Sequence, residues 1–130
     1  MSNRTIEDVM ADFKRGFAKV DRERLAAAVT DDFQWHMHWS ESDDDQPTGK
    51  VLQGLDAVMA EIERRRDNWS ELRYNDVEER FIDDMIVQTF VVSGVDANGK
   101  RFNAAAVDLY PLRDGLIAAK QTYWKQPGSF

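Results

Sequence analysis

Apolar residues near the start of the chain recur every three or four positions, which is the spacing of an amphipathic helix. Thr5 and Asp8 occupy the two positions of a capping box, so this helix is predicted to begin just after Thr5. Asp21 is a second candidate N-cap and predicts a short helix that ends near Thr30. Two helices therefore open the chain. The apolar face of the first consists of Ile6, Val9, Met10, Phe13, Phe17 and Val20.

The period of the pattern changes to two at Phe33, which predicts a half-buried strand. The range 41–49 contains four carboxylates, a Pro and a Gly with almost nothing apolar, so it is predicted to be a solvated loop. Helical spacing returns from Leu55 to Trp69 and predicts a third helix. In the strand, apolar and polar positions alternate in the order Phe33, Gln34, Trp35, His36, Met37, His38, Trp39 and Ser40.

β-Branched and aromatic residues dominate the rest of the chain and predict a sheet. Turns are expected at Asp83-Asp84, at Asn98-Gly99 and at Arg113-Asp114-Gly115; the Asn-Gly pair is a strong hairpin signal because tight turns need positive φ. The order of elements predicts one α+β domain over residues 1–130, with helices on one face of a curved sheet. The four predicted strands are Leu72–Ile82, Ile86–Val95, Phe102–Leu112 and Leu116–Lys125.

Composition narrows the classes of function. The 130 residues, 42% of them hydrophobic, suffice for one core. The formal net charge of -7 argues against nucleic acid and against an anionic membrane as partners, because both need clustered Lys and Arg. There is no cysteine, which excludes disulfides and thiol nucleophiles. No run is long and apolar enough for a signal or a membrane span, so we expect a cytoplasmic protein.

Several segments of the chain resemble the nuclear transport factor 2-like superfamily, in particular its SnoaL-like and ketosteroid isomerase-like branch. The segments that carry the resemblance are Ala106 to Tyr110, Arg113 to Ile117, Gln121 to Trp124 and Asp31 to Phe33. The resemblance implies a cone-shaped, cystatin-like fold with three N-terminal helices packed on a curved, mostly antiparallel sheet. It also implies an apolar pocket inside the cone and a homodimer formed through the outer face of the sheet.

Asp108 is the first candidate for a catalytic residue. It is predicted to share a strand face with Ala104, Ala106 and Tyr110, where a carboxyl group loses its solvation. Such surroundings favour the neutral acid, which can donate a hydrogen bond to a ligand carbonyl. The resemblance implies the same role, since the similar aspartate in ketosteroid isomerases is an oxyanion-hole donor. The alternative is a structural Asp, paired with a loop amide or with Arg73, Arg80 or Arg101.

Two other positions depart from the ketosteroid isomerases. Met37 stands where the resemblance would place the general-base aspartate, and methionine cannot transfer a proton. Phe13 stands where the first helix would supply the oxyanion-hole tyrosine, and its ring has no hydroxyl donor. Classical ketosteroid isomerase activity is therefore not expected.

His36 and His38 are the other two candidates for acid–base catalysis, because histidine titrates near neutral pH. Strict alternation points both away from Trp35 and Met37, so a bulge would be needed to turn them inward. Their spacing also suits a metal pair, but no third ligand is identifiable, and no metal is predicted. The alternative is that both are partly exposed residues at an interface.

Aromatic and apolar residues suggest a binding pocket beside Asp108, although the same residues in alternation are often simply core. The run Arg64-Arg65-Arg66 is interpreted as a solvated helix face, because Glu61, Glu63 and Asp67 flank it. No phosphate loop or dinucleotide motif is present, so no cofactor is predicted. The candidate pocket residues are Phe13, Trp35, Met37, Trp39, Tyr110 and Trp124.

Two functional hypotheses remain at this point. The first is a SnoaL-like protein that binds a small apolar carbonyl-containing molecule in an internal pocket, with cofactor-free isomerase, cyclase or hydratase chemistry. The second is a non-catalytic ligand-binding or dimerisation module of the same fold. Asp108 in apolar surroundings favours the first, and the departures at Met37 and Phe13 favour the second. The sequence leaves open whether the chain is an enzyme.

Overall fold

Three helices and six strands make up the computed structural model, which describes residues 4–37 and 49–125. Their order confirms the predicted α+β class and every predicted helix. One short strand, β2, was not predicted, because its four residues show no period of their own and are ordered by pairing with β1. The elements are α1 (Ile6–Lys19), α2 (Arg22–Ala28), β1 (Val29–Met37), β2 (Lys50–Gln53), α3 (Gly54–Asn68), β3 (Ser70–Ile82), β4 (Met85–Val95), β5 (Arg101–Arg113) and β6 (Leu116–Trp124).

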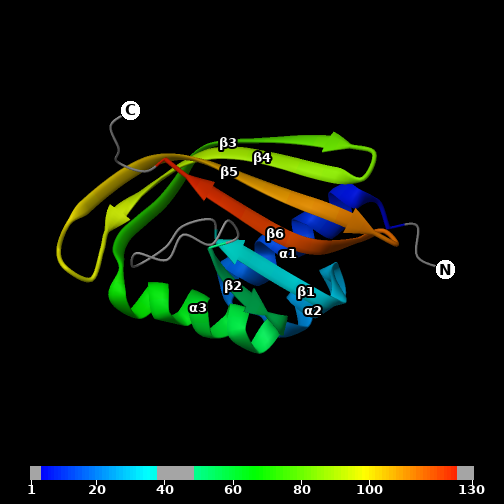
Figure 1. The fold of residues 1–130 in the computed structure, drawn as a ribbon, viewed down its shortest axis with the longest axis horizontal. Coiled ribbons are helices and arrows are strands. Elements are labelled where there is room, and N and C mark those ends of the chain that lie inside the picture. The colour runs from blue at the N-terminus through cyan, green and yellow to red at the C-terminus, as the bar shows by residue number, and fades with distance from the viewer. Residues whose placement is uncertain (1–3, 38–48, 126–130) are drawn as a thin grey trace.

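The strands form one sheet in the order β2-β1-β6-β5-β4-β3 (Figure 1). The last four strands are an antiparallel meander, as predicted. β1 pairs with β6 in parallel, so the first strand is joined to the last, and the sheet is mixed but mostly antiparallel. This pairing brings the N-terminal third of the chain against its C-terminal strand.

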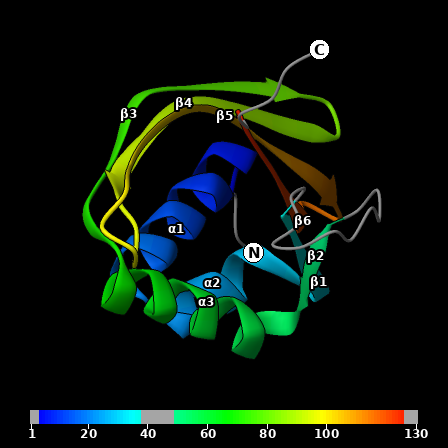
Figure 2. The same ribbon diagram turned by 60° about the vertical axis from the view of Figure 1, so that its left-hand side comes forward.

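The sheet curves around α1, which lies in the hollow while α3 runs along the open side (Figure 2). Two bulges in β3 contribute to the curvature, because the pairing with β4 shifts by one residue after Ser70 and again after Asn75. Glu71 and Asp76, which lie in these bulges, adopt positive φ angles of 54° and 55°. The inner side of the curve is the only face of β3 to β6 that the helices cover.

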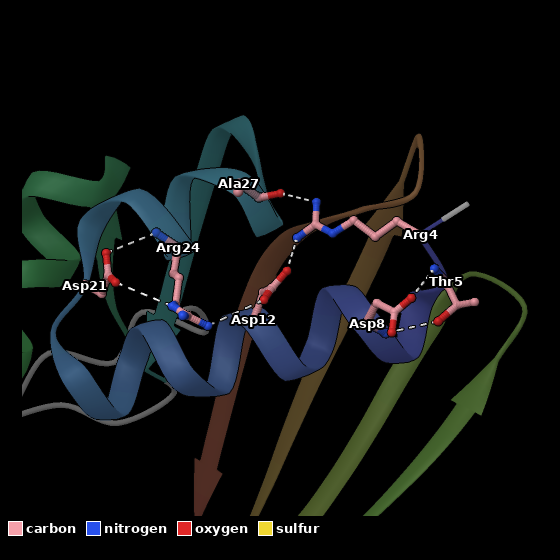
Figure 3. Close-up of polar contacts among 7 residues, drawn as sticks. All are labelled: Arg4, Thr5, Asp8, Asp12, Asp21, Arg24 and Ala27. Carbon is pink, nitrogen blue, oxygen red and sulfur yellow. Dashed lines mark hydrogen bonds and ion pairs between the residues drawn. The ribbon is translucent and has the colours of Figure 1, made fainter. Parts of the chain in front are cut away.

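Both predicted helix starts are confirmed (Figure 3). The Thr5 hydroxyl accepts a hydrogen bond from the Asp8 backbone N–H, and the Asp8 carboxylate accepts one from the Thr5 N–H, which completes the capping box. Asp21 caps α2 by accepting a hydrogen bond from the Arg24 N–H. Arg4 then ties the two helices together, since its guanidinium donates to the Asp12 carboxylate on α1 and to the Ala27 carbonyl of α2.

The largest group of buried apolar residues lies between the helices and the inner face of the sheet. α2 ends at Ala28, and β1 begins at Val29, four residues earlier than the alternating pattern predicted. Its first residues carry no alternation, since Val29 and Thr30 are both buried and the next two residues are exposed. Within the described ranges, no helix is long and apolar enough to cross a membrane.

All three predicted turns join the strands expected. Asp114 and Gly115 both have positive φ, as a two-residue hairpin turn of the meander requires. The hairpin at Asn98-Gly99 has a longer loop than a tight turn, spanning the residues between Val95 and Arg101. The Asp96 carboxylate closes that loop by accepting hydrogen bonds from the backbone N–H groups of Asn98 and Lys100.

Candidate functional site

A cavity of about 220 Å³ lies between α1 and the inner face of the sheet. Tyr74 and Val77 are 43% and 46% exposed and stand at its mouth, whereas Asp108 and Lys120 are buried at its inner end. The wall is mostly aromatic and aliphatic, with four polar side chains in addition to the hydroxyl groups of two tyrosines. The lining consists of Phe13, Lys14, Phe17, Ala18, Tyr74, Val77, Gln88, Phe90, Asp108, Tyr110 and Lys120.

Asp108, Tyr110 and Lys120 form a compact polar cluster at the inner end of the cavity. The Lys120 ammonium donates to Asp108 Oδ2 over 2.6 Å and to the Tyr110 hydroxyl oxygen over 3.0 Å. The Tyr110 hydroxyl lies 3.2 Å from Asp108 Oδ2 and can donate to it. Asp108 and Tyr110 are each 1% exposed and Lys120 is 7% exposed, so all three groups are withdrawn from solvent.

Aromatic rings surround the Lys120 amine. Its Nζ lies 5.0 Å from the ring centre of Phe17, 5.1 Å from that of Tyr110 and 5.4 Å from that of Trp35. Burial lowers the pKa of the Lys120 amine, and the attraction of the Asp108 carboxylate only partly opposes this. Burial also raises the pKa of the Tyr110 hydroxyl well above its ordinary value, and the negative charge of Asp108 adds to the effect.

One oxygen of Asp108 is left without a partner. Oδ2 is engaged by Lys120 and faces the Tyr110 hydroxyl, whereas buried Oδ1 has no hydrogen-bond donor among the described residues. A buried acceptor without a donor costs free energy. The cluster therefore offers an acceptor to a molecule that enters the cavity.

Hydrogen bonds connect this cluster to the cavity mouth. The Tyr110 hydroxyl can also donate to Gln88 Oε1 over 3.1 Å, and Gln88 Nε2 donates to Glu79 Oε2 over 2.9 Å. Glu79 in turn accepts from the ammonium of Lys14, which is exposed on α1. A continuous polar path thus runs along one wall of an otherwise apolar cavity.

Sequence reasoning found Asp108 but missed its partner. The expected structural partners were Arg73, Arg80 and Arg101, and the ion pair is instead formed with Lys120 from the neighbouring strand. The reason is a bulge in β6. Leu112 pairs with Ile117, whereas Leu109 pairs with Gln121, so β6 contains one extra residue between these pairs.

The bulge decides which way Lys120 points. Near the Asp114-Gly115 turn, Leu112 pairs with Ile117. If this register continued along β6 without a bulge, Lys120 would pair with Leu109 and point to the outer face. The extra residue instead brings Thr122 opposite Asp108 and turns Lys120 to the inner face, because a shift of one residue reverses every side chain of a strand. The burial of Ile117, Lys120 and Thr122 shows the bulge, because these positions break strict alternation along β6.

A second, much smaller void of about 10 Å³ continues the cavity past Lys120. Trp35 and Trp124 line it together with Arg65 of α3. The Arg65 guanidinium lies 4.7 Å from the ring centre of Trp35 and 5.5 Å from that of Trp124. The volume of this void suits about one water molecule. A larger ligand therefore fits only in the main cavity.

Arg65 corrects the interpretation of Arg64-Arg65-Arg66 as a solvated face. Its side chain is buried and donates through Nε to Glu61 Oε2 over 2.8 Å, while Arg64 binds the same carboxylate from the exposed side. Burial alone would raise the pKa of the Glu61 carboxyl, but the hydrogen bond from Arg64 and the charge of Arg65 hold it below its ordinary value. Of the predicted intrahelical pairs, those of Glu61 are present, and they lie at the buried side of α3.

The other predicted pocket residues divide into three groups. Phe13 and Tyr110 line the main cavity, and Trp35 and Trp124 line only the small void. Trp35 is fixed by a hydrogen bond from its Nε1 to the Thr122 hydroxyl. Met37 is buried but lines neither space, since its sulfur contacts the Arg65 guanidinium at 3.5 Å.

His36 lies on the face of β1 opposite Trp35 and Met37, as alternation predicted, and does not line the cavity. Its Nε2 lies 2.9 Å from Gln34 Oε1 on the same face. His38 and Trp39 lie outside the described residues. Within the described ranges, no group of three His, Cys, Asp or Glu side chains is placed to hold a metal ion.

A family model described as the SnoaL-like domain matches residues 10–120 of the chain. No curated protein matches the chain in sequence.

Several solved structures share the fold. An NTF2-like protein from Burkholderia xenovorans has a TM-score of 0.77 and 16% identity, with 96% of this chain and 92% of that chain covered. A proposed polyketide cyclase from Xanthomonas campestris has a TM-score of 0.69 and 20% identity, with coverages of 95% and 93%. A protein of ketosteroid isomerase-like fold from Catenulispora acidiphila, in complex with trimethylamine, has a TM-score of 0.67 and 13% identity, with coverages of 89% and 84%.

Proposed function

The chain belongs to the SnoaL-like domain family, and from this premise we propose that it binds a small, largely apolar carbonyl compound in its internal cavity. The observation that carries the proposal is the position of the Asp108–Lys120–Tyr110 cluster at the buried end of an otherwise apolar cavity. An apolar pocket with a few converging polar groups is the usual form of a small-molecule site. The apolar wall takes up the body of the ligand, and the cluster orients its polar end.

The size of the cavity limits the ligand. Its volume of about 220 Å³ lies below the range of about 300–1,000 Å³ that is common for drug-sized ligands. Phe13, Phe17 and Phe90 line the cavity, and an aromatic lining suits a flat molecule. The proposal is therefore a compound of one or two rings, and a full steroid is too large for it.

The cluster contains the groups needed for cofactor-free proton transfer. The ammonium of Lys120 and the hydroxyl of Tyr110 are donors for a carbonyl oxygen, and their interaction strengthens as negative charge develops on that oxygen. Oδ1 of Asp108 is an acceptor for the proton on the carbon beside the carbonyl. Removal of that proton, with a proton given to the carbonyl oxygen by Lys120 or Tyr110, gives the enol. In a conjugated ligand, return of a proton to another carbon completes an isomerisation.

The Xanthomonas campestris protein of the same fold is described as a proposed polyketide cyclase. This description supports carbonyl compounds as the first class of ligand to test. The non-catalytic module is the second candidate. It is favoured by the ion pair itself, since Lys120 balances the charge of Asp108 with no ligand present. The second candidate covers a ligand-binding module and a dimerisation module, and only the dimerisation module leaves the cavity without a ligand.

Thermal denaturation with small aromatic ketones tests the proposal, because a ligand that binds only the native state raises the melting temperature. We expect 2-acetylnaphthalene and 1-indanone to raise it in the wild type. Ala18→Trp places a large ring at the exposed rim of the cavity and is expected to abolish the shift, whereas Ala18→Ser is expected to retain it. If no ketone changes the melting temperature of the wild type, the proposal is wrong and the non-catalytic module is preferred.

We also propose that the chain forms a homodimer through the outer face of the sheet. Val87, Val91, Val107 and Leu109 point outward from β4 and β5, and Val107 pairs with the exposed Tyr123 of β6. The three helices lie on the other side of these strands. An apolar sheet face of this kind is typically covered by a partner.

A further inference from the structure

The amine of Lys120 is buried at the inner end of the cavity, 2.6 Å from Asp108 Oδ2. We propose that this amine forms a reversible imine with the carbonyl carbon of an aldehyde or ketone held in the cavity. This inference rests on the proposed function, because it requires a carbonyl ligand, but it adds a bond that ligand binding alone does not need.

The position of Lys120 separates it from every other lysine of the chain. Lys120 alone among the lysines is buried in the described ranges, and its amine faces the cavity from the inner side of β6. Lys14 also lines the cavity, but its side chain is 46% exposed at the mouth and its ammonium is paired with Glu79. The chain therefore provides an internal comparison between two lysines that border the same space.

The reaction needs a neutral amine, and the cluster supplies an acceptor for its proton. Asp108 Oδ2 lies 2.6 Å from Nζ and takes one proton from the ammonium, which leaves a neutral amine beside a neutral acid. In a buried site this neutral pair competes with the ion pair, since both charges lose solvation. Burial also lowers the pKa of the Lys120 amine, which acts in the same direction.

Tyr110 and Asp108 carry the protons in the remaining steps. The nitrogen lone pair attacks the carbonyl carbon, the C=O π electrons move to oxygen, and a proton passes from nitrogen to that oxygen through the Tyr110 hydroxyl, 3.0 Å from Nζ. The carbinolamine oxygen then receives the proton that Asp108 holds and leaves as water. The nitrogen lone pair forms the C=N bond, so the products are a protonated imine, a carboxylate and one water molecule.

The product keeps the electrostatics of the free protein. A protonated imine on Lys120 carries the same single positive charge as the ammonium and stays beside the Asp108 carboxylate. No buried charge is left without its counterion, which would otherwise be costly. The imine also withdraws electrons from the adjacent carbon, and unpartnered Oδ1 of Asp108 is available to remove a proton there.

Reductive trapping tests the inference on the intact chain. The protein is incubated with 2-naphthaldehyde and sodium cyanoborohydride, which reduces the imine to a stable secondary amine, and is then analysed by intact mass and peptide mapping. We expect one aldehyde-derived group per chain, located on Lys120. Lys120→Arg, which keeps the positive charge beside Asp108, is expected to lose this adduct, and Lys100→Arg, at an exposed position away from the cavity, is expected to retain it.

Two outcomes overturn the inference. Adducts confined to exposed lysines such as Lys14 would show that Lys120 does not react, and peptide mapping of the wild type decides this even if Lys120→Arg fails to fold. Thermal shift with 2-acetylnaphthalene is measured in parallel. A shift without an adduct on Lys120 overturns the imine and leaves the proposed function standing, whereas neither a shift nor an adduct overturns both.

Discussion

Lys120 and Asp108 lie on adjacent antiparallel strands, with 2.6 Å between Nζ and Oδ2, and both side chains are buried. Desolvation of two charges costs free energy that their mutual attraction offsets only in good geometry, so a buried ion pair contributes little to net stability. The pair lies at the inner end of a cavity, next to an acceptor oxygen that has no donor among the described residues, and this position is the basis of the proposed function. Variants of the pair separate its contribution to stability from its proposed contribution to ligand binding.

Removing either member of the pair is expected to destabilise the fold strongly. Asp108→Asn and Lys120→Met are each expected to lower the free energy of unfolding by about 3–5 kcal/mol, because each leaves the other charge buried without its counterion. The double variant is expected to lose less than the sum of the single losses, since it leaves no buried charge in the pair. Urea denaturation of the four proteins measures all three differences.

An exposed ion pair provides the control. Arg101 and Glu71 are 76% and 59% exposed, and Glu71→Gln is expected to change the free energy of unfolding by only about 0–1 kcal/mol. Strictly additive losses in the double variant would contradict direct coupling between Asp108 and Lys120. The ligand tests apply only to variants that fold.

The buried Glu61 carboxylate is expected to make stability depend on pH in the acid range. Its pKa in the folded protein lies below the ordinary value of 4.5, so the folded state binds fewer protons than the unfolded state. The stabilisation is therefore complete above about pH 4.5 and is lost as the pH falls through the folded pKa. Glu61→Gln is expected to be less stable than wild type at neutral pH, by a difference that shrinks on acidification.

Glu63→Gln is the matched control for Glu61→Gln, because Glu63 lies on the same helix with an exposed side chain. Thermal unfolding of the three proteins between pH 3 and pH 7 gives the comparison. A difference between wild type and Glu61→Gln that stays constant over this range would contradict the assignment.

A charge on the outer sheet face is expected to separate the homodimer. Leu109→Glu places a carboxylate among Val87, Val107 and the neighbouring outward-facing residues, where it would be buried by a partner. Sedimentation velocity is expected to show a dimer for the wild type and for Ala18→Glu, which changes an exposed position on α1, and a monomer for Leu109→Glu. A monomeric wild type would refute the proposed dimer.

The predicted elements depended on signals that lie close together in the sequence. The capping box of Thr5 and Asp8, the N-cap of Asp21 and the turn at Asp114-Gly115 were all correct, because each acts over a few residues. β2 could not be predicted in this way. Its four residues become a strand only through pairing with β1, and that pairing is a tertiary contact.

The candidate site was predictable in part for the same reason. Alternation along β5 placed Asp108 and Tyr110 on one buried face, and helical spacing put Phe13 on the inner face of α1. The environment of Arg65 was not predictable from charge pattern alone. The flanking Glu61, Glu63 and Asp67 suggested a solvated face. The rings of Trp35, Trp69 and Trp124 instead lie around its guanidinium.

By itself, the sequence determined the helices, the meander and a buried carboxylate on β5, since propensity, capping and period are properties of short segments. Only the tertiary structure decided that Lys120 is the partner of Asp108. The extra residue in β6 reverses the faces of the strand beyond it, and its position is set by pairing with β5 and β1, which are distant in the sequence or in register. The lysine thus enters the cavity because of long-range strand register, and the chemistry proposed for the site follows from that register.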